Sequence, residues 1–126
     1  MSLRGKIVIV LASWLFVACS GLRSIPPSQP HLYQSVRDAA EWRNPYLVVY
    51  GDGVQVRGFA GRITLEALPS TLAHLPWDAW PYGRVVGVQE TGIRSDKDDE
   101  LVRENLAKVL KSLKHLGIEV QLWPSA

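Results

Sequence analysis

The sequence contains a single cysteine, Cys19, and this scarcity limits its chemistry. One cysteine cannot form an internal disulfide. The three histidines, His31, His74 and His115, lie on separate segments, and none has a second ligand type at zinc-like spacing. We therefore expect no bound metal and no other cofactor.

Recognisable catalytic motifs are also missing. No Gly-x-Ser-x-Gly occurs, and the glycine-containing run GDGVQVRG precedes an expected strand rather than a helix, which argues against a phosphate-binding loop. The acidic run SDKDDE, residues 95–100, lacks the ligand spacing and central glycine of a calcium loop, and a helix cap explains it better. We expect a protein that is not an enzyme. The alternative is a small envelope hydrolase whose site assembles in the 74–90 region from His74, Glu90 and the aromatic loop between them.

The chain carries little excess charge of either sign. Fourteen lysines and arginines face twelve acids, and two of the basic residues, Arg4 and Lys6, precede the first apolar run. The 108 residues after position 18 hold twelve bases and twelve acids. The folded part therefore offers no electrostatic case for binding nucleic acid.

No hydrophobic run is long enough to span a bilayer. Residues 7–18, IVIVLASWLFVA, are twelve uncharged and mostly apolar residues, whereas a spanning helix needs about 20. They follow the short positive segment MSLRGK, so residues 1–18 have the layout of an export signal. The polar, proline- and serine-containing stretch over residues 19–30 is expected to be a flexible tether.

The end of this apolar run resembles the lipobox of bacterial lipoproteins. Val17, Ala18 and Cys19 match that pattern, while Phe16 stands where leucine is usual. The resemblance implies that Cys19 is the lipidated residue and that the membrane is a partner through its acyl chains. Ser20 resembles the outer-membrane sorting pattern, which implies an outer-membrane location facing the periplasm. An ordinary cleaved signal and an uncleaved N-terminal anchor are the two alternatives.

The first half of the expected domain combines one helix and a hairpin. Residues 31–43 have apolar side chains at spacings of three and four, which predicts a short amphipathic helix. The run YLVVY at 46–50 and the alternating run that starts at Val54 predict two strands. The Asp-Gly turn between them favours a β-hairpin.

The second half predicts two helices that alternate with two strands. Thr64 can cap a helix over 65–75, and the strongest periodicity predicts a helix over 98–116 with an acidic first turn and a basic last turn. Strands are expected at 84–90 and 118–122. Right-handed crossovers would place both helices on one face of the sheet. We expect a single α+β domain over residues 31–126, with a four-stranded mixed sheet, two helices on one face and a short preceding helix.

The order β-β-α-β-α-β, with its DG hairpin and the segments PYGRVVGV and LGIEVQL, resembles the periplasmic domain of the ExbD/TolR family. The resemblance covers residues 46–123 and implies a small domain that dimerises and contacts envelope partners. That family couples protons through a transmembrane aspartate. Residues 7–18 contain no acid, so the resemblance does not extend to proton transduction.

The best candidate for partner binding is the loop that carries Trp77, Trp80 and Tyr82. Tryptophan and tyrosine are enriched in binding hot spots, but large aromatic residues also often close one end of a core, and both interpretations remain open. We expect a lipid-anchored envelope protein with a non-catalytic binding or assembly domain. Its partner would be an envelope protein, a cell-wall component, or a second copy joined at a sheet edge.

Overall fold

The computed structural model describes residue 22 and residues 24–125. The expected signal peptide and Cys19 lie outside these residues. In chain order the elements are η1 (Pro30–Leu32), η2 (Ala39–Glu41), β1 (Tyr46–Tyr50), β2 (Gly53–Val56), α2 (Leu68–Ala73), η3 (Trp77–Ala79), β3 (Val85–Glu90), α3 (Asp96–His115) and β4 (Glu119–Trp123), where η denotes a single 3-10 turn.

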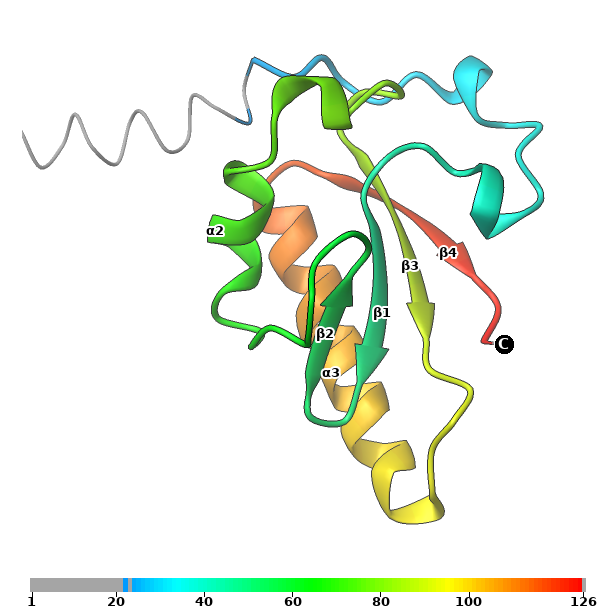
Figure 1. Ribbon diagram of the computed structural model, residues 1–126, viewed down its shortest axis with the longest axis vertical. Coiled ribbons are helices and arrows are strands. Elements are labelled where there is room, and N and C mark those ends of the chain that lie inside the picture. Colours follow the sequence, from blue (N-terminus) through cyan, green and yellow to red (C-terminus); the bar gives the residue numbers. More distant parts are fainter. Residues whose placement is uncertain (1–21, 23, 126) are drawn as a thin grey trace, which may run out of the picture.

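The four strands form one mixed sheet in the order β2-β1-β3-β4 (Figure 1). Strands β1 and β2 are an antiparallel hairpin, whereas β1 pairs with β3 and β3 with β4 in parallel. The expected α+β fold with a four-stranded mixed sheet is confirmed.

Alternating side chains give the sheet two different faces. The main core lies between one face and the two helices: strand residues such as Leu47 and Val88 pack there with Leu72 of α2 and Leu113 of α3. The opposite face carries an aromatic cluster, in which Tyr33, Trp42, Tyr46, Tyr82 and Trp123 meet with ring centroids 4.9–6.2 Å apart.

Helix α3 begins and ends as its sequence indicates. The Ser95 side chain accepts a hydrogen bond from the backbone N–H of Asp98, and the acidic residues that follow favour the positive end of the helix dipole. At the other end Gly117 has a φ of 75°, and the N–H groups of Gly117 and Ile118 donate to the carbonyls of Lys114 and Leu113. This Schellman motif turns the chain directly into β4.

The expected helix over 31–43 is instead two short 3-10 turns, η1 and η2. The Asp38 side chain accepts a hydrogen bond from the Ala40 N–H and so starts a separate turn. Tyr33 and Trp42 are both buried in the aromatic cluster. Packing of these rings on distant strands outweighs a weak helical periodicity.

The expected helix over 65–75 is shorter, because α2 covers only Leu68–Ala73. Thr64 accepts a hydrogen bond from the Ala67 N–H and closes a turn before the helix starts. Pro69 then occupies the first turn, where its missing N–H is tolerated.

Residues 24–30 differ from the flexible tether expected over 19–30, because they pack on the domain. Leu22 and Ile25 are only 6% and 5% exposed and belong to the main core. The Arg84 N–H donates to Pro26 O at 2.9 Å, and the Gln29 N–H donates to Tyr82 O at 2.9 Å. The polar composition of residues 19–30 predicted a tether, but two apolar residues of this segment, Leu22 and Ile25, pack in the core.

Candidate functional site

The outer edge of β4 is the most accessible part of the sheet. Strand β4 is last in the strand order, and no described residue pairs with its outer side. At the other end of the sheet, Val54 of β2 exchanges two backbone hydrogen bonds with Ile63, which partly covers that edge. The two edges are therefore not equivalent, and β4 is the open one.

The direction of each backbone group in β4 follows from one hydrogen bond. The Glu119 N–H donates to Arg84 O on the β3 side at 3.0 Å. Because successive backbone groups of a strand point to opposite sides, Gln121 and Trp123 also face β3, and the N–H and C=O groups of Val120 and Leu122 point away from the sheet. These two residues offer two donors and two acceptors to an added strand.

A groove accompanies this edge on the helix side. It is lined by Leu110 and Lys114 of α3 and by residues 117–120 and Leu122. Val120 packs partly on the main core, whereas Leu122 is 57% exposed. The groove thus joins unpaired backbone groups to apolar side chains and to the charged residues Lys114 and Glu119, a combination that suits an extended peptide.

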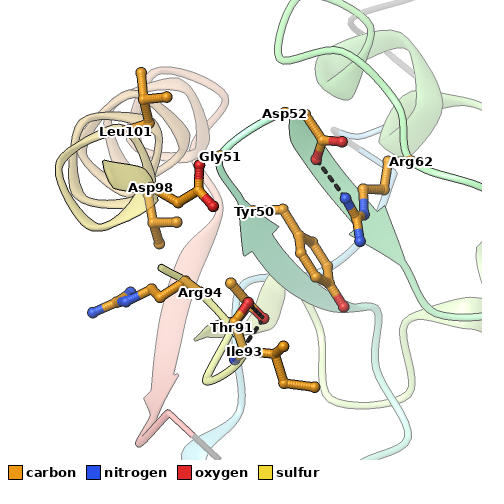
Figure 2. A pocket seen from close by; sticks show the side chains of 10 residues that line it. Tyr50, Gly51, Asp52, Arg62, Thr91, Ile93, Arg94, Asp98 and Leu101 are labelled. Carbon is orange, nitrogen blue, oxygen red and sulfur yellow. Dashed lines mark hydrogen bonds and ion pairs between the residues drawn. The ribbon is translucent and has the colours of Figure 1, made fainter. Parts of the chain in front are cut away.

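A second recess lies at the carboxyl ends of β1 and β3, beside the first turn of α3. It has a volume of about 270 Å³, and Figure 2 shows Tyr50, Asp52, Arg62, Arg94 and Asp98 around it. Exposed apolar side chains, Ile93 and Leu101, contribute to its lining. No pattern in the sequence indicates this recess, because its walls come from four separate segments.

Both arginines of the recess are neutralised by nearby acids. Arg62 forms an ion pair with Asp52 at 2.6 Å, and its guanidinium lies 3.7 Å from the Tyr50 ring centroid. Arg94 contacts Glu90 and Asp99, each at 2.8 Å, and its hydrogen bond with Glu90 is the main cause that raises the Arg94 pKa. Both cations are therefore paired with carboxylates, and neither is left unpaired to bind an anion.

The three aromatic residues proposed for partner binding separate in the structure. Trp80 and Tyr82 are 4% and 6% exposed: Trp80 lies in the main core and Tyr82 in the aromatic cluster. Trp77, on turn η3, is 80% exposed. Two of the three residues therefore close the core, and Trp77 alone projects into solvent.

The residues of the hydrolase alternative do not assemble. Glu90 ends β3 and pairs with Arg94, whereas His74 follows α2 and its Nδ1 lies 2.7 Å from Ser70 O. Strand β3 begins beside the turns that follow α2 and runs away from them (Figure 1). Glu90 and His74 consequently lie toward opposite ends of the sheet.

The part of the chain that the structure describes contains neither a metal-ligating cluster nor a membrane-spanning helix. There, no group of three or more His, Cys, Asp or Glu side chains is arranged to hold a metal ion. No described helix combines the length and the apolar character needed to cross a bilayer.

Comparison with known proteins found no matching family model, no matching curated protein and no matching solved structure.

Proposed function

We propose that this chain is a lipid-anchored protein of the bacterial cell envelope and that its non-catalytic domain binds an extended segment of another envelope protein along β4. The open β4 edge is the observation that carries this proposal. The anchor rests on the lipobox-like residues 16–19, and an outer-membrane location facing the periplasm rests on Ser20. The resemblance to ExbD/TolR domains supports partner binding through element order alone.

The chemistry of the groove specifies the expected partner segment. The outward N–H and C=O groups of Val120 and Leu122 would each bond to the added strand. Apolar side chains at every second position of that strand would face Leu110 and Leu122, and an acidic residue would meet Lys114. Backbone bonds would supply affinity, and the apolar and acidic positions would supply specificity.

A second copy of the chain is the competing occupant of the edge. In an antiparallel β4–β4 pair, the usable outward groups would place Val120 opposite Leu122 of the other copy. Alternative registers would use Pro124, which has no N–H, or the Ile118 N–H, which already donates to Leu113 O at 2.9 Å. Gln121 would then lie opposite Gln121 of the other copy.

The proposed edge binding is tested by the variant Leu122→Pro in the full-length chain. The N–H that proline removes points away from β3, so the ladder within the sheet is kept while the outward donor is lost. Leu122→Ala is the matched control, because it shortens the same side chain but keeps the N–H. A photocrosslinking residue at the exposed position Gln121 should capture a partner in cells, and Leu122→Pro should lose the crosslink more completely than Leu122→Ala.

Two results would contradict parts of this proposal. Crosslinks that persist unchanged in Leu122→Pro would exclude strand addition at β4. A disulfide-linked dimer of Gln121→Cys under mild oxidation would identify a second copy as the occupant.

The anchor has a separate test, in which cells are labelled with a clickable fatty acid and the wild type is compared with Cys19→Ser. Equal labelling of the two proteins would exclude acylation of Cys19.

A further inference from the structure

The first buried residue of the described chain lies close to the proposed anchor in the sequence. Leu22 belongs to the main core together with Ile25 and Trp80, and the Ile25 N–H donates to Leu22 O at 3.1 Å. Three peptide units separate Leu22 from Cys19, so their Cα atoms can be at most about 11 Å apart. The interfacial layer of one leaflet is itself about 5–8 Å thick. An acylated Cys19 would therefore hold the domain directly at the membrane surface.

Two exposed apolar side chains, Trp77 and Leu32, lie on turns at this same end of the domain. Figure 1 shows η3, in light green, and η1, in cyan, at the end where the described chain begins. Turn η3 carries Trp77, which is 80% exposed, and turn η1 carries Leu32, which is 43% exposed. Tryptophan prefers the headgroup level of a bilayer, where its ring is partly buried and its N–H stays hydrated.

The charges along α3 also distinguish the two ends of the domain. Four acids, Asp96, Asp98, Asp99 and Glu100, lie in its first turns, which Figure 1 places at the far end of the domain. The exposed basic residues Lys108, Lys111 and Lys114 lie in its second half, which is nearer to the end of the domain where the described chain begins. An anionic lipid surface would attract the lysine-bearing half and repel the acidic turns.

We propose that the domain itself docks end-on against the bilayer, with the Trp77 side chain inserted at the headgroup level and the first turn of α3 pointing away. This inference rests on the proposed acylation of Cys19. It makes the membrane a direct contact surface of the folded domain, in addition to the site of its lipid chains. Leu32 is the second apolar contact at this surface.

End-on docking also limits which partner can use β4. Strand β4 is parallel to β3, which begins toward the end where the described chain starts and runs away from it (Figure 1). An antiparallel second copy would therefore carry its own Leu22 at the end that faces away from the bilayer. Two copies paired in this way cannot both dock on one membrane, so docking favours a different protein as the occupant of the edge.

The proposal is tested with full-length acylated protein in vesicles of phosphatidylethanolamine and phosphatidylglycerol. A nitroxide is attached to Trp77→Cys, and a control nitroxide to Ile93→Cys, which lies at the carboxyl end of β3 and is 92% exposed in the native chain. Acylated Cys19 has no free thiol, so each variant carries one label. Collision with oxygen and with a water-soluble nickel chelate reports depth. We expect the label at position 77 to be shielded from nickel and the label at 93 to be accessible.

A longer linker between Cys19 and the folded domain provides the matched control. A Gly-Ser insertion of about ten residues between Cys19 and Leu22 adds roughly 17 Å of average reach. We expect this insertion to increase nickel accessibility at position 77 while the protein still floats with the vesicles. If the native-length protein floats but its label at 77 is as accessible as the label at 93, docking is excluded and the anchor stands. If it neither floats nor carries acyl chains on Cys19, both proposals fail.

Discussion

The Tyr46 ring of β1 lies directly over Gly87 of β3. A methyl group added at Gly87 would approach Cδ2 of that ring to 2.6 Å, which is far inside van der Waals contact, and would lie 3.1 Å from the indole Nε1 of Trp123. The absence of a side chain at Gly87 thus allows the aromatic cluster to rest on the sheet.

The variant Gly87→Ala should lower the free energy of unfolding by about 1–3 kcal/mol, because the two rings must move or the sheet must shift. Thermal unfolding followed by near-ultraviolet circular dichroism measures both the stability and the packing of the rings. Gly51→Ala is the matched control: its added methyl group would meet the nearest side chain at an ordinary 3.6 Å. Equal stability of the two variants would contradict the role given to Tyr46.

The start of the folded domain can be tested by truncation. A chain that begins at residue 31 lacks Leu22 and Ile25, whereas one that begins at residue 22 keeps both. Burial of an aliphatic side chain contributes about 1.5–3 kcal/mol, so the shorter chain should be less stable by roughly 3–6 kcal/mol. Urea unfolding of the two chains measures the difference. Equal midpoints and slopes would restore the interpretation of residues 19–30 as a tether.

The sequence predicted the elements whose side chains repeat regularly, and it failed where long-range packing decides. Helix α3 was found from its stripe of apolar residues and its charged ends, and β1 from a run of β-branched and aromatic residues. The prediction of a helix over 31–43 is wrong because Tyr33 and Trp42 are buried against Tyr82, which lies 49 and 40 positions further along the chain. Local periodicity cannot register such a contact.

The candidate site, like the fold, could be predicted from the sequence only in part. An open sheet edge could be expected from the number and order of strands. That β4 rather than β2 is open depends on the bridge between Val54 and Ile63, which no pattern in the sequence signalled. The roles of Trp77 and Trp80 also could not be separated from the sequence, because they lie on the same short loop.

Asn44 joins three backbone groups of the turn before β3. Its side-chain amide donates to Gly83 O at 2.8 Å and to Val85 O at 2.7 Å, and its carbonyl oxygen accepts from the Tyr82 N–H at 2.8 Å. Asn44 is buried, so Asn44→Ala would remove these bonds where water cannot easily replace them. We expect a loss of roughly 2–4 kcal/mol in the free energy of unfolding, measured by urea titration.

The variant Asn44→Asp distinguishes the hydrogen bonds that the Asn44 side chain donates from the one that it accepts. A carboxylate keeps the acceptor for the Tyr82 N–H but loses both donors and brings a charge into a buried site. This variant should therefore be at least as unstable as Asn44→Ala. A stability close to that of the wild type would show that the Gly83 and Val85 carbonyls find other donors.

Replacing each of the two tryptophans of the aromatic loop with alanine should affect stability to very different extents. Trp80→Ala removes a ring that is almost fully buried in the main core and should cost about 3–5 kcal/mol. Trp77→Ala removes an exposed ring and should leave the unfolding midpoint nearly unchanged. Thermal unfolding of the two variants in detergent checks this difference. A large loss in Trp77→Ala would mean that its side chain supports the fold, which would weaken its assignment to the membrane surface.

Tyr46 should also make the stability of the domain sensitive to alkaline pH. Burial raises the Tyr46 pKa above its usual value of 10.0, an effect that the positive charge of Arg57 partly opposes. Above the pKa of the unfolded chain, the folded state keeps a proton that the unfolded state has lost. The stability due to Tyr46 is therefore fully present below pH 10 and is lost as the pH rises through the raised pKa. Tyr46→Phe cannot ionise, so its unfolding midpoint should fall less than that of the wild type between pH 9 and 11. Parallel pH profiles for the two proteins would contradict burial as the cause, because the other tyrosines and the lysines are common to both.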